Sequence, residues 1–435
     1  MENADNRLLK LREKAFKHNS YLVQGRRGLK IAFFGTLPPL TERLASTSSG
    51  MLVLLSNSNR IDSIDFYGQV GAKIPDAASD DKIDLKETWR IDSPISLIRT
   101  MVRLVRSTRT DTFFFNLYLT MFGRRRLSNV IGLLMPIVVS KLTKKRVVVY
   151  MHNFIETEDA HKLGYKANFF SVAGVSLLEK MLIRNTIMIV PRPSQKEILE
   201  MKYHGAITSL IIPYVEGISS IIHEEESRKR LSILRNKVNV LLFGRWGPQK
   251  DLESGLHILS DLIDAGCNIH VTVAGSVNSN FPEYERILLK AMNAIPKQHL
   301  DYVGDVPEES VPRLFYNSDI LFLPYVASGG YSAVMNLGAL YGLRVVAYDI
   351  EQLRENDGII GARTLFINPS EQSAVSKLKA VVEQVDFSEK QTQFELDGKL
   401  RHAEIATDAL IDRLSCKGKT DFVGNGQSSA SPFQQ

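Results

Sequence analysis

The sequence contains little cysteine and no long apolar run. Only two cysteines, Cys267 and Cys416, occur among 435 residues, and neither has the spacing of a zinc ligand. We therefore expect neither a disulfide framework nor a metal site. No run of about 18 apolar residues is present, and the first residues include acids and lack the apolar segment of a secretory signal. These absences predict a cytoplasmic protein.

The chain is too long for one ordinary core, and its 44% of hydrophobic residues suffice for two domains. From Lys30, short apolar runs such as KIAFFG and RVVVYMHN alternate with helical stretches. A second set begins with KVNVLLFG and ends with TLFIN. Such alternation is typical of parallel sheets buried on both faces. We therefore predict an α/β protein with two Rossmann-like, doubly wound parallel-sheet domains, whose ligands bind at the carboxyl ends of the strands.

Changes in this pattern predict the domain limits. Residues 30–212 form the N-terminal domain and residues 238–387 the C-terminal domain, with a charge-rich linker over 213–237. The outer segments are a polar extension over 1–29, a helix over 388–416 that packs back on the N-terminal domain, and a tail over 417–435. The tail is rich in Gly, Ser and Gln, which predicts disorder.

The segment VLLFGRWGPQKDLESGLHIL places Gly244, Arg245 and Lys250 in a turn between a strand and a helix. An arginine can fork onto phosphate oxygens, a lysine supplies a point charge, and a helix amino terminus adds backbone donors. This combination suits a diphosphate. The alternative is that both are ordinary surface cations in a turn.

A second strand-to-helix turn contains small residues. Ser328, Gly329 and Gly330 follow a strand, and a helix is expected to begin near Tyr331 and Ser332. Glycines let the backbone approach a ligand, and the amides at the helix start suit a phosphate. Alternatively, these residues only make a tight connection.

Four segments, in order, resemble family 4 of the glycosyltransferases, which are retaining enzymes with the GT-B fold, in which two Rossmann-like domains face a central cleft. FGRWGPQK resembles the G-R-x-x-x-x-K signature, and IIPYVEGI resembles the interdomain I-P-N-G-V-D segment. YVGDVPEESVPRLFYNSDILFLP resembles the stretch F-x-G-x-V followed by L-Y-x-x-A-D-x-x-x-x-P, and MHNF resembles the T-x-H-D/N position. The resemblance covers roughly Lys30 to Phe387.

The resemblance implies an enzyme that transfers a sugar, expected to be a hexose, from a nucleotide diphosphate sugar to an acceptor hydroxyl with retention. The acceptor is expected to be a glycan precursor or a lipid-linked molecule. No cofactor is expected. No metal is expected either, since the cationic side chains at the diphosphate take the place of a metal ion. The implied catalytic residues are His152, Arg245 and Lys250. The implied donor-binding residues are Gly244, Gly304, Asp305, Val306, Ser328, Gly329, Gly330, Tyr331, Ser332 and Asn336.

The sequence departs from the family at two glutamates. Gly329 and Leu337 stand where the family has them, so Ser328, Ser332 and backbone amides are expected to hold the sugar phosphate, and Asn336 to reach the ribose. The paired glycines after the first strand are also missing, although Gly35 remains as a site on the acceptor side. A catalytically inactive GT-B scaffold or binding protein and a nucleotide-sugar epimerase-like enzyme are the alternatives.

A basic stretch lies in the N-terminal half. Eleven lysines and arginines stand between Arg99 and Arg146 against one acid, Asp111. Arg99, Arg103 and Arg106 are spaced to lie along one helical face. We expect this face to contact an anionic membrane or a lipid-linked diphosphate. No nucleic acid is expected, because no nucleic-acid module accompanies the stretch. The alternative is a solvated basic face.

Overall fold

The computed structural model forms two compact units. It describes residues 28–39, 43–76, 78–123, 125–154, 169–203, 207–210, 237–278, 281–307, 310–328, 332–360, 362, 364–370, 373–385 and 407–415. The predicted extension over 1–29, the linker over 213–237 and the tail over 417–435 lie outside this set, apart from residues 28, 29 and 237. We call the unit with residues 28–154, 169–210 and 407–415 the N-terminal domain, and the unit with residues 237–385 the C-terminal domain.

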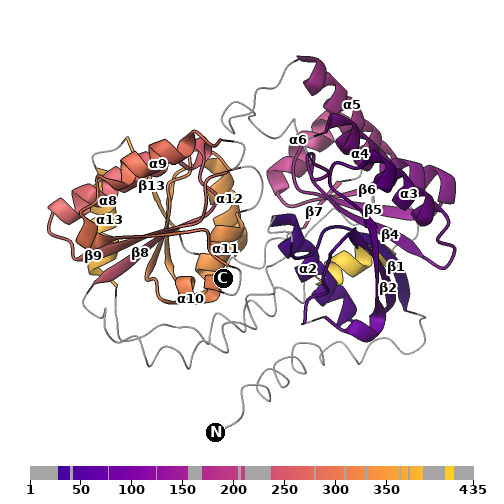
Figure 1. The fold of residues 1–435 in the computed structure, drawn as a ribbon, viewed down its shortest axis with the longest axis horizontal. Coiled ribbons are helices and arrows are strands. Elements are labelled where there is room, and N and C mark those ends of the chain that lie inside the picture. Colours follow the sequence, from indigo (N-terminus) through magenta and orange to yellow (C-terminus); the bar gives the residue numbers. More distant parts are fainter. Residues whose placement is uncertain are drawn as a thin grey trace, which may run out of the picture. The chain divides into compact units, whose positions relative to one another are not determined.

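The N-terminal domain contains a seven-stranded parallel sheet in the order β3-β2-β1-β4-β5-β6-β7 (Figure 1). Its strands are β1 (Leu29–Phe34), β2 (Ile61–Gln69), β3 (Ile83–Trp89), β4 (Thr112–Leu117), β5 (Arg146–Met151), β6 (Ile187–Val190) and β7 (Ile207–Ser209). Its helices include α2 (Arg43–Ser56), α3 (Pro94–Val105), α4 (Arg126–Thr143), α5 (Phe169–Asn185) and α6 (Pro193–Tyr203), and the 3-10 turn η1 (Asp80–Lys82) precedes β3.

The C-terminal domain contains a six-stranded parallel sheet in the order β10-β9-β8-β11-β12-β13. Its strands are β8 (Val238–Phe243), β9 (Ile269–Ala274), β10 (Leu300–Gly304), β11 (Ile320–Leu323), β12 (Arg344–Tyr348) and β13 (Leu365–Ile367). Its helices are α8 (Leu252–Asp264), α9 (Tyr284–Met292), α10 (Val311–Tyr316), α11 (Ala333–Leu340), α12 (Glu351–Ile360) and α13 (Ser373–Glu383), with 3-10 turns η4 (Pro248–Lys250) and η5 (Lys297–His299).

The two strand orders confirm the predicted fold class. In each sheet the first strand has the second strand on one side and the fourth on the other, which is the doubly wound Rossmann arrangement. The winding reverses between β1 and β4 and between β8 and β11. Ligands of such sheets bind at this switch point, beyond the carboxyl ends of the strands.

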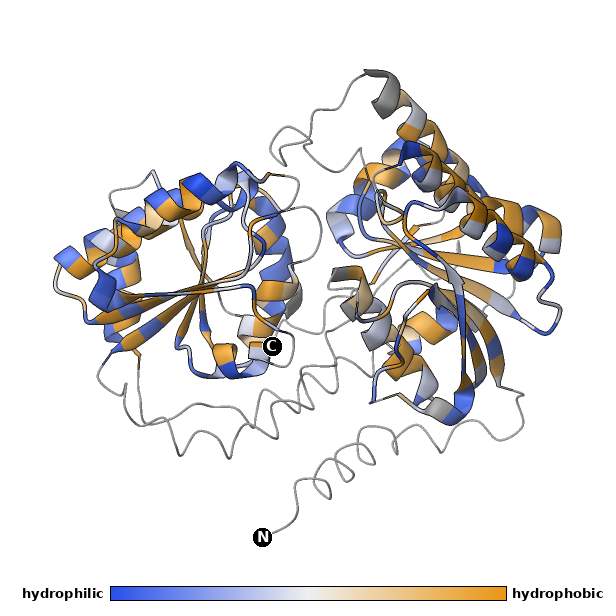
Figure 2. Cartoon of the chain, in the orientation of Figure 1, coloured by the Kyte–Doolittle hydropathy of each residue, from blue (hydrophilic) through white to orange (hydrophobic). Residues whose placement is uncertain are grey.

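Apolar strands build the core of each sheet. All six residues of β4 are buried, and Phe113, Phe114 and Phe115 are 0% exposed, because helices cover both faces. Figure 2 shows the strands mostly hydrophobic and the helices banded. The helix expected after Lys250 is α8, in which Leu252 and Leu256 are fully buried.

Helix α4 is long and apolar enough to cross a membrane by length and composition alone. It nevertheless packs against α3, α5 and β5. Seven of its residues are buried in the N-terminal domain, namely Ser128, Gly132, Leu133, Met135, Pro136, Ile137 and Val139. These contacts make it a covering helix of the sheet.

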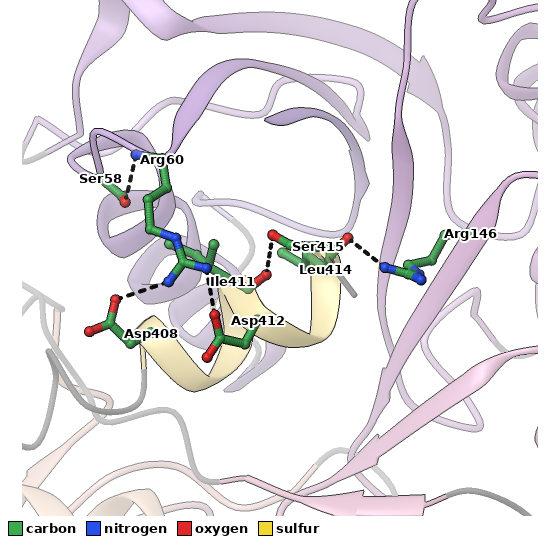
Figure 3. Close-up of polar contacts among 8 residues, drawn as sticks. All are labelled: Ser58, Arg60, Arg146, Asp408, Ile411, Asp412, Leu414 and Ser415. Carbon is green, nitrogen blue, oxygen red and sulfur yellow. Dashed lines mark hydrogen bonds and ion pairs between the residues drawn. The ribbon is translucent and has the colours of Figure 1, made fainter. Parts of the chain in front are cut away.

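The helix over residues 407–415 packs on the N-terminal domain, although it lies near the end of the sequence (Figure 3). Leu410, Ile411 and Leu414 are each 0% exposed. Arg60 forms ion pairs with the carboxylates of Asp408 and Asp412. At the other end of this helix, the Leu414 carbonyl accepts from Thr112 Oγ1 at 2.9 Å and from Arg146 Nη1 at 3.4 Å.

The Thr112 contact predicts a stability effect. Thr112→Val keeps the shape of the side chain but removes the buried donor to Leu414, so we expect the N-terminal domain to lose about 1 kcal/mol of unfolding free energy. The chain has two tryptophans, and Trp89 lies in this domain while Trp246 lies in the other. Urea unfolding followed by Trp89 fluorescence in a Trp246→Phe background measures the effect. Thr112→Ser and Thr112→Ala both lack the buried methyl and differ in the hydroxyl, so the serine variant should be the more stable of the two. Equal stability of these two variants would contradict a role for the hydrogen bond.

Candidate functional site

Lys250 lies at the switch point of the C-terminal sheet. Its Nζ donates to the Tyr325 hydroxyl at 3.0 Å, and this hydroxyl donates to the Phe243 carbonyl at 3.4 Å. Phe243 ends β8, whereas Tyr325 follows β11. The ammonium also lies 4.5 Å from the centre of the Tyr325 ring and 5.8 Å from that of Trp246, within the range of cation–π attraction. These contacts hold one positive charge beside the ends of the two strands.

Two glycines let backbone and ammonium come together here. Gly244 has a φ of +149°, and a Cβ on it would lie 2.3 Å from Lys250 Nζ. Gly275, which follows β9, has a φ of +107°, and a Cβ on it would lie 1.8 Å from the Gly244 carbonyl oxygen. A side chain at Gly275 would therefore collide with fixed backbone, whereas one at Gly244 would displace the Lys250 ammonium. We call the backbone of Gly244 and Gly275, which carries no side chain, the backbone floor below Lys250.

The loops beyond β8 and β9 continue to pair after the sheet ends. Gly244 N donates to the Ala274 carbonyl at 3.1 Å, and Trp246 N donates to the Ser276 carbonyl at 2.9 Å. Arg245 stands between these two bonded residues, and its side chain is exposed. Pairing on both sides fixes the backbone that carries the arginine.

The turn that carries Lys250 leads directly into α8. Lys250 ends η4, and Asp251 begins α8 by accepting from Ser254 N at 3.5 Å and Ser254 Oγ at 2.9 Å. Burial raises the pKa of the Asp251 carboxyl, and the two hydrogen bonds from Ser254 oppose that rise. The amino terminus of α8 thus adds its partial positive charge beside Lys250.

The loop after β11 is tied to the same turn. The amides of Val326 and Ala327 donate to the Gln249 carbonyl at 3.0 and 3.2 Å. Ser328 follows and is half-buried. Gly329, Gly330 and Tyr331 lie outside the described residues. The two strand-to-helix turns identified in the sequence are therefore held together.

Asn336 belongs to α11, and Ser332 is the N-cap residue directly before this helix. The Ser332 hydroxyl accepts from Met335 N at 3.3 Å and is nearly inaccessible, so it caps the helix. Asn336 is half-buried. Leu337, at one of the two glutamate positions, is 7% exposed and packs in the core of the domain. Its side chain therefore faces other apolar residues.

Three of the predicted donor-binding residues, Gly304, Asp305 and Val306, lie at the end of β10 and directly after it. Gly304 has a φ of +70°, and its carbonyl accepts from Gly275 N, which links the ends of β9 and β10. Asp305 is exposed and accepts from Ser276 Oγ at 3.2 Å. Val306 is half-buried against the core. These residues continue the same edge of the sheet.

His152 lies near the switch point of the N-terminal sheet. It follows β5, and its backbone N donates to the Leu117 carbonyl at 3.0 Å. Its Nε2 lies 2.8 Å from Asn116 Oδ1, and Asn116 Nδ2 donates to Ser48 Oγ at 2.9 Å. Because the Asn116 amide nitrogen is directed at Ser48, its oxygen faces His152, so Nε2 carries the proton. Asn116 thereby fixes the tautomer.

Gly35 joins this cluster from β1. It is buried, and a Cβ on it would lie 2.8 Å from Ser48 Oγ. Gly35 on one side and Asn116 on the other thus bracket the switch point between β1 and β4. Arg99, Arg103 and Arg106 are exposed on α3, whose main contacts are with α4 and β3, so they form a separate surface.

Four further residues, Tyr325, Gly275, Asn116 and Ser48, contribute to these two sites although no sequence motif indicated them. Three of them stand at or just after strand ends, in DILFLPY, HVTVAG and TFFFNLYL. The sequence places these three residues near strand ends, but it does not indicate which residues they contact. Among the residues described, no group of three His, Cys, Asp or Glu side chains could hold a metal ion.

Comparison of the sequence with protein-family models and with curated proteins gives no match. Solved structures do match. A glycosyltransferase from Rickettsia africae is 11% identical with a TM-score of 0.61, covering 89% of this chain and 98% of its own. HepE from Anabaena, solved with UDP and glucose, is 14% identical with a TM-score of 0.55, covering 89% and 95%.

A UDP-forming α,α-trehalose-phosphate synthase from Burkholderia xenovorans, solved with glucose-6-phosphate, is 10% identical with a TM-score of 0.62. The match covers 89% of this chain and 100% of the synthase. At these identities the likeness shows the fold alone. The chain has the GT-B fold of these glycosyltransferases, with two parallel-sheet α/β domains.

Proposed function

We propose that the chain is a glycosyltransferase that uses a nucleotide diphosphate sugar as donor. The observation that carries this proposal is Lys250, held by Tyr325 at the switch point above side-chain-free backbone. An ammonium, an exposed arginine and a helix amino terminus around bare backbone suit a diphosphate. Structures with the same fold were solved with UDP or a sugar phosphate, which supports this ligand class.

Arg245 and Lys250 would neutralise the diphosphate as it leaves. The bond between the anomeric carbon and the terminal phosphate oxygen breaks, and its electron pair stays on that oxygen. The acceptor hydroxyl oxygen forms the new bond to the carbon, and its proton passes to the leaving phosphate. Two fixed cations stabilise the developing charge, which is the electrostatic contribution to catalysis. We propose transfer of a hexose with retention, and without metal.

The remaining candidate residues have separate roles in this proposal. Gly304, Asp305 and Val306 would contact the base, and Ser328 and Asn336 the sugar and ribose. His152 would act on the side of the sugar and acceptor, with its ring oriented by the contact between Nε2 and Asn116 Oδ1. Asn116 would keep this orientation, and it is a positioning residue.

A nucleotide panel tests the proposal. Purified protein is heated alone and with nucleoside mono- and diphosphates and nucleotide sugars, and the rise in Tm is recorded. A ligand that binds the folded state raises Tm according to its concentration and Kd. We expect one diphosphate and its sugar to stabilise the protein. If no nucleotide binds at millimolar concentration, the chain is a binding or scaffold protein with a GT-B fold.

The contact between Tyr325 and Lys250 predicts a moderate loss of diphosphate affinity when the tyrosine hydroxyl is removed. Tyr325→Phe removes the hydroxyl that accepts from Lys250 but keeps the ring beside the ammonium. We expect the Kd of the bound diphosphate to rise about two- to ten-fold, the range for one lost hydrogen bond. Isothermal titration measures it. Tyr348→Phe is the matched control, since that buried hydroxyl has no hydrogen-bond partner among the residues that the structure describes. An equal effect in both variants would remove Tyr325 from the site.

A further inference from the structure

Helix α3 exposes an apolar row beside a row of arginines. Its buried side consists of Leu97, Thr100 and Leu104. Ile95, Ile98 and Val102, on the exposed side, are 64%, 44% and 40% exposed. Arg99, Arg103 and Arg106 are exposed next to them around the helix. Single exposed apolar residues are ordinary, but three in one row beside three cations form an amphipathic surface.

Helix α4 extends this surface, because the loops that precede the two helices are bonded together. Asp92 N donates to the Phe122 carbonyl at 2.9 Å, and Arg125 N donates to Asp92 Oδ1 at 2.7 Å. The first turns of α3 and α4 therefore lie side by side. Leu127 and Val130 in α4 are 61% and 39% exposed.

We call this surface the α3–α4 face. It comprises Ile91, Ile95, Ile98, Arg99, Val102, Arg103, Arg106, Arg125, Arg126, Leu127 and Val130, all of which are exposed. Figure 2 shows hydrophobic and hydrophilic residues alternating along α3 and α4.

The charge of this face is almost entirely of one sign. The only acids between residues 92 and 130 are Asp92 and Asp111. Asp92 is partly buried, and one of its carboxylate oxygens accepts from Arg125 N. Asp111 precedes β4 and accepts from Lys30 N at 2.9 Å, at the opposite end of the sheet from the first turn of α4. The five arginines of the face therefore give the segments that form it a positive charge, with Asp92 as the one acid that borders α3 and α4.

We infer that the α3–α4 face docks on an anionic lipid membrane. The arginines would contact lipid phosphates, while the isoleucine, valine and leucine side chains enter the boundary between headgroups and acyl chains. A nucleic acid would use the arginines but would gain nothing from the apolar row, because binding to its backbone comes from neutralised phosphates. The apolar row therefore favours a membrane.

Vesicle sedimentation tests this inference without any donor or acceptor, so its outcome is separate from that of the nucleotide panel. We expect the wild type to bind vesicles of phosphatidylcholine with phosphatidylglycerol, and to bind pure phosphatidylcholine much more weakly. Replacing Arg99, Arg103 and Arg106 by Gln should weaken binding by on the order of a hundred-fold, at about five-fold per basic residue. Ile95→Ser with Ile98→Ser should also weaken it, including at high salt, where arginine contacts are screened.

The matched control places the same charge change on the other domain. Arg286→Gln, Lys290→Gln and Arg344→Gln remove three exposed cations of the C-terminal domain, and vesicle binding should persist. Trp89 fluorescence verifies that the α3 variants are folded. An equal loss in the control triple would assign binding to net charge and overturn the inference. Unchanged binding of the isoleucine variant, together with tighter binding to a DNA duplex than to vesicles, would replace the membrane by nucleic acid.

Discussion

Replacing Lys250 by alanine is expected to lower kcat/KM about 10²- to 10³-fold for the nucleotide sugar that stabilises the wild type. This is the range for removal of one group that stabilises developing charge in an enclosed site. Arg245→Ala should act in the same direction. The fall in kcat/KM of the double variant should be smaller than the product of the two single falls, because both cations act on one leaving group.

Binding measurements locate the effect on the diphosphate. If Lys250 contacts the terminal phosphate, Lys250→Ala should raise the Kd of a nucleoside diphosphate about ten-fold or more. This is the effect of losing one hydrogen bond to a charged group. The corresponding monophosphate should bind almost unchanged. Arg313→Ala removes an exposed cation from the same domain and is the control. Equal weakening of mono- and diphosphate by Lys250→Ala would place the lysine elsewhere in the site.

Local sequence patterns were sufficient for the elements that carry the site. The segment VLLFGRWGPQKDLESGLHIL predicted a strand, a turn and a helix in the order that β8, η4 and α8 show. The doubly wound strand order followed, because parallel strands need crossovers and crossovers have one hand. The edge of each sheet at which Lys250 and His152 lie was therefore predictable.

The contacts that position those residues join distant parts of the chain. Tyr325 is 75 residues from Lys250, and Asn116 is 68 residues from Ser48. The helix over 407–415 meets Arg60 across about 350 residues of sequence. No period or spacing encodes such pairs, since each depends on which strands become neighbours. Burial of Leu337 in the core could not be predicted for the same reason, whereas the cap that Ser332 forms with Met335 N is a local contact.

Gly275→Ala is expected to be the most damaging small substitution in the C-terminal domain. A Cβ there would lie 1.8 Å from the Gly244 carbonyl oxygen, and no side-chain rotation can relieve a clash at Cβ. The φ of +107° adds strain for any residue but glycine. Left-handed backbone costs about 1–2 kcal/mol and overpacking about 1–3 kcal/mol, so we expect a loss of about 2–5 kcal/mol of unfolding free energy.

Gly266→Ala separates the two causes. Gly266 also has a positive φ, +83°, but a Cβ on it would meet nothing within 4 Å. Gly266→Ala should therefore lose only the free energy of the unfavourable backbone conformation, about 1–2 kcal/mol. Trp246 fluorescence in a Trp89→Phe background measures both variants during urea unfolding. Equal losses of unfolding free energy would show that the loop after β9 can move away from Gly244, so the backbone floor below Lys250 would be adaptable. A larger loss for Gly275→Ala than for Gly266→Ala means that the fold fixes this floor before any nucleotide binds.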